Sequence, residues 1–103
     1  MLFVIQAIDK TPGSEARTNT RPAHLQYLAD AGDRIKLAGP MLAGEGAGDD
    51  QGVPIGSLII IDAASEAAVK LFADNDPYTS AGVFKEVTIR PFKGVTGAYL
   101  ADD

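Results

Sequence analysis

Residues 55–62 read Ile-Gly-Ser-Leu-Ile-Ile-Ile-Asp and form the clearest strand pattern in the chain. The four residues Leu58–Ile61 are all aliphatic, so both faces of a strand here are apolar. Such a pattern is typical of a strand that is covered on both sides. The stretch Leu2–Ile8 (LFVIQAI) has the same character and is rich in β-branched and aromatic residues. We therefore expect a sheet that contains these two strands and is covered on both faces.

The first helix is expected between these strands, over Ser14–Ala31. Ser14 can cap its first turn, and Gly32 closes it. Pro22 leaves two alternatives open, because a proline inside a helix removes a hydrogen bond. Either it kinks this helix, or it sits in the first turn of a shorter helix capped by Thr20.

A second helix is expected over Ser65–Asp74, capped by Ser65. Its apolar stripe is predicted to be Ala68, Leu71 and Phe72. The stretch Asn75-Asp76-Pro77 ends it, because the residue before a proline is pushed out of the α region.

Two further strands complete the pattern. A short strand over Arg34–Ala38 is predicted to end at Gly39-Pro40. The last strand covers Val83–Phe92, with Val83, Val87 and Ile89 on one face.

The resulting order is β-α-β-β-α-β, the split βαβ arrangement. It predicts an α+β fold of the ferredoxin-like kind, with a four-stranded, mainly antiparallel sheet and both helices on one face. The other face should then be in contact with water, yet the first and third strands are apolar on both sides. A second copy of the same sheet would cover it. We therefore expect a homodimer that associates through this face.

Length and composition indicate one domain over residues 1–103, because 103 residues can bury one core and no second. Ala43–Pro54 holds four glycines and three acids and is expected to be a flexible loop, with residues 95–103 as a C-terminal tail. Because the net charge is −5, we expect no nucleic-acid partner. The absence of cysteine excludes disulfides and thiolate sites. Without a long apolar run or a basic leader, we expect no membrane association and a cytoplasmic location.

The chain has one histidine, His24, and it falls on the same side of the first helix as Leu28 and Ala31. Asp76 follows the second helix, and in a split βαβ fold it can reach a side chain on the first. A histidine oriented by an aspartate is a usable general acid or base near neutral pH. The alternatives are a half-buried histidine with satisfied hydrogen bonds, and a plain turn at Asn75-Asp76-Pro77.

Other polar residues have weaker patterns. Arg17 and Arg21 lie one turn apart and could together hold a small carboxylate, or both could be solvated. Ser57 is at most a polar residue that lines a site. No metal or organic cofactor is expected, since a second histidine and an EF-hand spacing are both missing. Phosphate-loop and serine-hydrolase motifs are missing as well.

Five short motifs, taken in order, resemble the YCII-related (YciI-like) family of small bacterial proteins. The resemblance extends over roughly Leu2–Phe92, and the motifs are Arg21–Leu28 (RPAHLQYL), Ala38-Gly39-Pro40, Gly56-Ser57-Leu58, Asp76-Pro77-Tyr78, and Ala81–Phe84 with Val87–Phe92. The resemblance implies a ferredoxin-like fold that dimerises through its sheets. It also implies an active site built on a histidine–aspartate pair, which falls on His24 and Asp76.

From the motifs and the resemblance we assign His24 and Asp76 to catalysis. We assign Arg21, Gly39, Pro40, Ser57 and Tyr78 to the binding of an unknown small-molecule ligand. A related domain with dehydrochlorinase activity on a hydroxyquinol ring implies that this scaffold can support acid–base chemistry. The favoured interpretation is an enzyme of the lyase or isomerase type. The alternative is a non-catalytic, dimeric binding or accessory domain.

Overall fold

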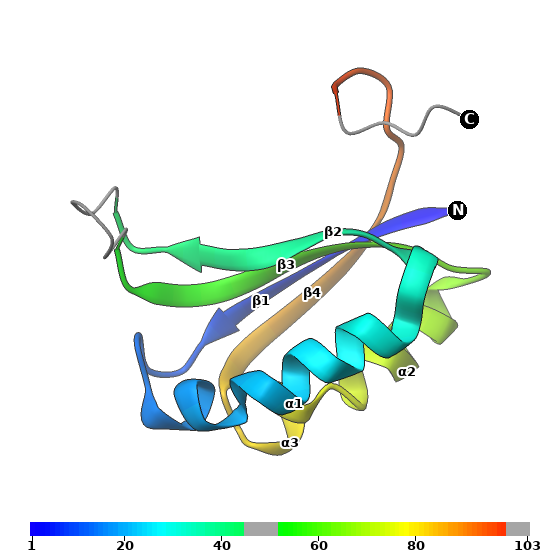
Figure 1. Cartoon of the computed structure of the whole chain (residues 1–103). Coiled ribbons are helices and arrows are strands. Elements are labelled where there is room, and N and C mark those ends of the chain that lie inside the picture. The colour runs from blue at the N-terminus through cyan, green and yellow to red at the C-terminus, as the bar shows by residue number, and fades with distance from the viewer. Residues whose placement is uncertain (45–51, 99–103) are drawn as a thin grey trace.

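The computed structural model describes residues 1–44 and 52–98, and these form one sheet with helices packed against it (Figure 1). The elements follow in the order β1 (Leu2–Asp9), α1 (Glu15–Ala31), η1 (Gly32–Arg34), β2 (Ile35–Leu42), β3 (Pro54–Asp62), α2 (Glu66–Asp74), α3 (Pro77–Ser80) and β4 (Phe84–Phe92). The sheet has the strand order β2-β3-β1-β4, and every neighbouring pair is antiparallel. This is the ferredoxin-like arrangement that the sequence predicts.

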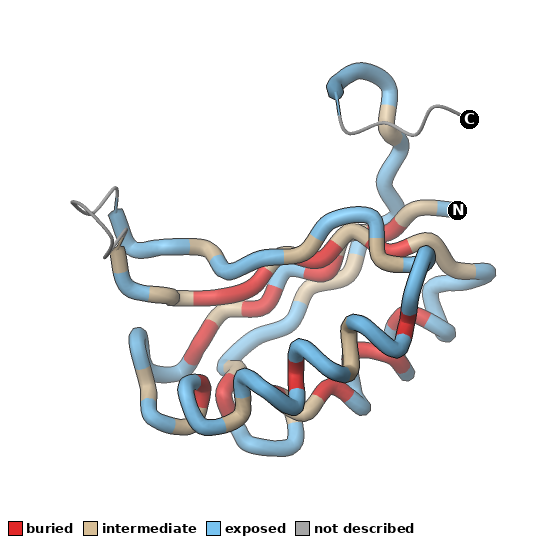
Figure 2. The backbone as a smooth tube through the Cα atoms, viewed as in Figure 1, coloured by how far each residue is buried: buried red, intermediate tan, exposed pale blue. Residues whose placement is uncertain are grey.

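The helices all lie on one side of the sheet (Figure 1). The hydrophobic core consists of strand and helix residues that pack together between the two layers. Figure 2 shows the most deeply buried strand residues on β1 and β3, the two central strands. Phe3, Ile5 and Ala7 of β1 alternate toward the helices and are buried. Ile59 and Ile61 of β3 face the same way, opposite Ile5 and Phe3 in the register.

The other side of the sheet, here called the open face, carries aliphatic residues that no helix covers. In the register, Val4 lies opposite Ile60, which lies opposite Leu37 on β2. Leu37 is exposed, and the remaining members of the open face are half-buried. The aliphatic residues that define it are Leu2, Val4, Ile8, Leu37, Leu58 and Ile60. The expectation that β1 and β3 are apolar on both sides therefore holds.

Helix α1 is continuous through Pro22. The side chain of Ser14 accepts a hydrogen bond from the backbone N–H of Arg17, so Ser14 is the N-cap. The shorter helix capped by Thr20 is therefore excluded. Pro22 leaves one carbonyl in the helix without its usual donor, and because Pro22 is exposed, water can reach that carbonyl.

The prediction that the second strand ends at Gly39-Pro40 is wrong. Strand β2 runs through both residues to Leu42, with Pro40 opposite Ser57. A proline is tolerated here because β2 is an edge strand, where not every N–H needs a partner in the sheet. The other edge strand, β4, also contains a proline, Pro91.

The predicted apolar stripe of α2 is also wrong in two of its three residues. Leu71 is 63% exposed and Ala68 is exposed, whereas Val69, Phe72 and Ala73 are buried. The buried set follows the i, i+3, i+4 spacing of one helix face, and Leu71 lies on the opposite side. Ser65 is the cap, as expected, since its side chain accepts from the N–H of Ala68.

The turn predicted at Asn75-Asp76-Pro77 leads into a short helix, α3, that the sequence analysis did not include. Asp76 is its N-cap and Pro77 its first residue, the position at which proline is favoured. The central part of the predicted acidic loop, residues 45–51, lies outside the described residues, as do residues 99–103 of the tail.

Gly56 allows β1 and β3 to approach closely, just before Ser57. A Cβ atom at Gly56 would collide with the backbone carbonyl oxygen of Ala7 and lie 2.7 Å from the Cε atom of Met41. We expect Gly56→Ala to lower the free energy of unfolding by about 1–3 kcal/mol, as overpacking does. Urea unfolding followed by circular dichroism measures this change.

Gly39→Ala is the matched control, because a Cβ atom there meets no heavy atom within 4 Å. We expect its unfolding midpoint to stay close to that of the unmodified protein. Equal midpoints for the two variants would show that Gly56 does not set the strand spacing.

Candidate active site

His24 and Asp76, which are 52 residues apart in the sequence, meet in the protein interior. The Nδ1 atom of His24 lies 2.9 Å from Oδ1 of Asp76, a hydrogen-bond distance. His24 is 6% exposed and Asp76 only 2% exposed. The structure thus brings together the two residues that the sequence assigned to catalysis.

The position of Asp76 follows from its role as a helix cap. Its backbone is extended (φ −64°, ψ 131°) because Pro77 follows it. Its Oδ1 atom accepts a hydrogen bond of 2.9 Å from the backbone N–H of Tyr78. Short helix α3 is tied to α2 by the Thr79 hydroxyl, which donates to the carbonyl oxygen of Ala73. The carboxylate that faces His24 is therefore held by local backbone structure.

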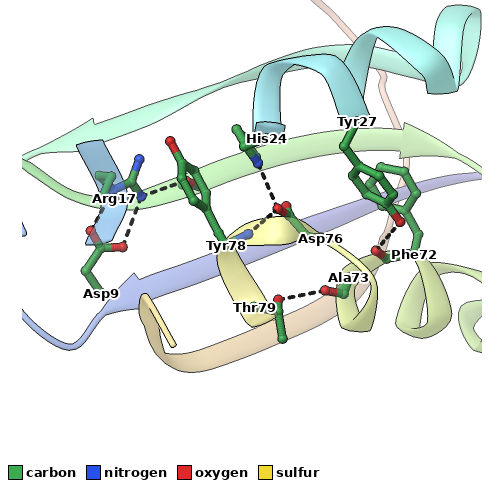
Figure 3. A network of polar contacts seen from close by, with 10 residues as sticks. Asp9, Arg17, His24, Tyr27, Phe72, Ala73, Asp76, Tyr78 and Thr79 are labelled. Carbon is green, nitrogen blue, oxygen red and sulfur yellow. Dashed lines mark hydrogen bonds and ion pairs between the residues drawn. The ribbon is translucent and has the colours of Figure 1, made fainter. Parts of the chain in front are cut away.

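Tyr78 lies between two basic side chains (Figure 3). Its ring is stacked on the imidazole of His24, with the ring centroids 3.9 Å apart and the planes inclined by 16°. On the other side, the Cζ atom of Arg17 lies 4.7 Å from the centroid of the Tyr78 ring. Tyr78 thus contributes its backbone N–H to Asp76 and its ring to His24.

Arg17 forms a buried ion pair with Asp9, at the end of β1. Its Nε atom donates to Asp9 Oδ2 at 2.7 Å, and its Nη2 atom donates to Asp9 Oδ1 at 3.0 Å. Nη2 also donates to the hydroxyl of Ser57 at 2.8 Å. Arg17 is therefore not solvated, which was one of the two sequence alternatives. It is also not free to hold a small carboxylate together with Arg21, which was the other alternative. It anchors α1 to two strands.

The charges around Tyr78 act in opposite directions on its hydroxyl. Burial raises the pKa of Tyr78, the positive charges of Arg17 and Arg21 lower it, and Asp76 raises it again, with a net rise. Tyr78 is therefore a neutral phenol at physiological pH. Burial alone would lower the pKa of Arg17, but the hydrogen bonds and charge of Asp9 outweigh it, and the pKa is raised above its ordinary value.

The remaining predicted binding residues lie at different depths. Ser57 is buried beside Arg17. Arg21 is exposed on α1, yet its charge acts on the hydroxyl of Tyr78. Gly39 and Pro40 are exposed on β2, and Pro40 lies opposite Ser57 in the register. Ser57 and Tyr78 therefore lie inside the site and Arg21 lies at its rim, whereas Gly39 and Pro40 are exposed on the edge strand β2, with Gly39 opposite Leu58 of the open face.

Asp9 was missed by the sequence analysis, which ended the first strand at Ile8. The alternation that makes Phe3, Ile5 and Ala7 face the helices also places residue 9 on that face. An aspartate at a position expected to be buried needs a positive partner. That rule, applied one residue further along the strand, could have found it.

A narrow cleft opens beside the pair, between α3 and the sheet. Its polar lining residues are Ser57, Asp76 and Thr79, and its other walls are apolar. The cleft has a volume of about 10 Å³, close to the space that one water molecule needs. His24 is not among its lining residues.

The described part of the chain offers no cluster of three or more His, Cys, Asp or Glu side chains that could hold a metal ion. The helices found within residues 1–44 and 52–98 are too short or too polar to cross a membrane.

The chain is similar in sequence to a family model and to several known proteins. The family model described as "YCII-related domain" matches residues 1–93. Protein YciI of Escherichia coli is 44% identical over 100 residues, covering 92% of this chain and 99% of the relative. The derivative of benzaldehyde biosynthesis cluster protein C of Emericella nidulans is 42% identical over 81 residues, covering 74% of this chain and 78% of the relative.

One solved structure is similar over nearly the whole fold. It is the 5-chloro-2-hydroxyhydroquinone dehydrochlorinase of Burkholderia phenoliruptrix, in complex with 2,5-dihydroxybenzoquinone. Its sequence is 36% identical, its TM-score is 0.81, and the match covers 90% of this chain and 94% of that one.

We expect Asp9→Ala to lower the free energy of unfolding by about 3–5 kcal/mol, because it leaves the charge of Arg17 buried and unpaired. Urea unfolding measures the change. Lys70→Ala is the matched control, since it breaks the exposed ion pair between Lys70 and Asp74. That loss should be within about 1 kcal/mol. Similar losses for the two variants would contradict a structural role for the buried pair.

Proposed function

The chain belongs to the YCII-related domain family, and on that premise we propose that it is an enzyme that moves protons on a small molecule, with His24 as the general acid or base. The single observation that supports this most is the buried bond of 2.9 Å between His24 Nδ1 and Asp76 Oδ1. The reaction class is a lyase or isomerase that needs no metal or organic cofactor.

The hydrogen bond to Asp76 selects one form of the neutral imidazole. A carboxylate only accepts, so the Nδ1 atom of His24 carries the proton and Nε2 keeps its lone pair. Nε2 is therefore the atom that takes a proton from the substrate. When the ring becomes positive, the Asp76 carboxylate and the face of the Tyr78 ring both stabilise it.

Arg21 brings a positive charge to the rim of the site, which favours an anionic or enolic oxygen in the substrate. Arg21 is exposed and close enough to act electrostatically on the Tyr78 hydroxyl, so it can hold such an oxygen as it forms. Arg17 is held by Asp9 and adds a fixed positive charge behind the ring of Tyr78.

The relatives suggest a hydroxylated ring as the substrate class. The solved relative is named for the removal of HCl from a chlorinated hydroxyhydroquinone. That chemistry needs a proton shuttle. One hydroxyl proton moves to the ring carbon that bears chlorine, and a second hydroxyl proton then leaves with chloride. A histidine held by an aspartate can perform both transfers.

The second candidate function is a non-catalytic binding domain. Arg21 is exposed at the rim and can hold an anion whether or not that anion then reacts. It therefore favours a binding domain as much as it favours an enzyme. In that case the His24–Asp76 pair serves as a satisfied polar contact in the protein interior.

We expect ¹⁵N NMR of the single histidine to show neutral His24 protonated on Nδ1. In Asp76→Asn this fixed tautomer should be lost, because an amide can donate to Nδ1 and select the other form. Asp74→Asn is the control, since Asp74 is exposed and pairs only with Lys70 among the described residues. A tautomer that is the same in all three proteins would contradict the proposed pair.

Substrate tests then separate the two functions. Chlorinated and hydroxylated aromatic compounds, including 5-chloro-2-hydroxyhydroquinone, are assayed for chloride release and for a shift in melting temperature. For an enzyme, His24→Gln should lower turnover by about 10²–10⁴-fold. A compound that raises the melting temperature but is not converted to a product would favour the binding domain.

We also propose that a second copy of the chain covers the open face. This face is aliphatic across three neighbouring strands, and its charged residues lie toward the edges, with Glu86 and Arg90 on β4. A face that carries both an acid and a base at its rim can match a copy of itself turned by 180°.

We expect the protein to sediment at micromolar concentration with twice the 10.7 kDa mass of one chain. Ile60→Lys puts a charge in the middle of the open face and should shift the protein to the monomer. Leu71→Lys is the control, because Leu71 is exposed on α2, away from this face. A monomeric unmodified protein would overturn the proposal.

A further inference from the structure

The carboxylate of Asp76 has one oxygen that the protein leaves unused. Both of its hydrogen bonds, from His24 and from the N–H of Tyr78, fall on Oδ1. Yet the side chain is only 4% exposed. Among the described residues, every fully buried side-chain nitrogen or oxygen has a hydrogen-bond partner. Oδ2 of Asp76 has no such partner, so it is not fully buried and a small molecule can reach it. The cleft that Asp76 lines provides this access.

Two other polar groups line the same cleft with unused hydrogen-bonding capacity. The Ser57 hydroxyl accepts a bond from Arg17, and its own hydrogen remains to be donated. The Thr79 hydroxyl donates to the carbonyl of Ala73, and its lone pairs remain to accept. The cleft therefore presents one donor and two acceptors between apolar walls.

These groups determine what the cleft can hold. An anion would be repelled by the carboxylate of Asp76, and an ammonium group has no lone pair to accept from Ser57. The smallest group that both donates and accepts is a neutral hydroxyl. The cleft volume of about 10 Å³ matches one such group.

We propose that this cleft is a hydroxyl-binding site, in which one O–H group donates to Asp76 Oδ2 and accepts from Ser57. The hydroxyl belongs either to a water molecule, which has a second hydrogen for Thr79, or to the substrate. Only the substrate hydroxyl rests on the proposed function. In both cases Asp76 connects the bound hydroxyl, through its two oxygens, to His24.

The test uses NMR on protein with ¹³C-labelled methyl groups. Ala7 and Val87 line the cleft, so their methyl protons report what it contains. We expect cross-peaks between these methyls and a long-lived water molecule. On addition of 2,5-dihydroxybenzoquinone, persistence of the water peaks identifies water as the occupant. Replacement by ligand peaks identifies a ligand hydroxyl, and both results support the site.

Two variants test the polar partners. Ser57→Ala should reduce the cross-peaks to background, but it also removes a partner of Arg17 and can destabilise the fold. Thr79→Val is therefore the second variant and should weaken the water peaks while keeping the side-chain shape. Thr88→Val is the matched control, because Thr88 lies opposite Gln6, on the open-face side of the sheet.

A cleft without water or ligand cross-peaks would overturn the inference, and so would peaks that neither Ser57→Ala nor Thr79→Val changes. Either of these outcomes would be compatible with a fixed tautomer of His24, so neither would contradict the proposed His24–Asp76 pair. Conversely, a histidine without a fixed tautomer beside a hydrated cleft would contradict the proposed function and leave the hydroxyl site standing.

Discussion

A buried ion pair anchors helix α1 to the sheet, and the position of the site depends on this anchor. Of its three buried residues, Arg17 and His24 are ionisable and only Ala31 is apolar. Arg17 joins the end of β1 and the middle of β3 through Asp9 and Ser57. His24 follows two turns later on the same side of the helix, so the anchor at Arg17 sets the height of the imidazole above the sheet. Fold and candidate chemistry therefore share one set of contacts.

The polar residues form a connected series that crosses the domain. Asp9 pairs with Arg17, whose guanidinium lies against one face of the Tyr78 ring, while His24 lies against the other face. Low-dielectric surroundings strengthen each of these interactions and make any unpaired member costly. Such a series keeps side chains in one geometry, which is what acid–base chemistry on a small molecule requires.

Much of the fold follows from local patterns in the sequence. The alternation in β1, the apolar run in β3 and the caps Ser14 and Ser65 were all predictable. The contact between His24 and Asp76 was predictable as well, because the topology places both helices on one face. Asp9 was missed because the predicted first strand ended at Ile8, although the same alternation places residue 9 on the buried face. Its partner, Arg17, lies on another element, so the alternation alone does not identify the ion pair. Leu71 was misplaced because apolar character alone does not fix the side of a short helix that faces the core.

The two prolines of the edge strands have a consequence for how chains can meet. Pro40 lies within β2 and Pro91 within β4, while the central strand β1 has none and β3 has one only at its first residue. An edge strand with a complete row of free N–H and C=O groups is a template for the addition of further strands and for aggregation. A proline takes one donor out of that row on each edge. The prolines therefore disfavour the addition of a further strand at either edge of the sheet.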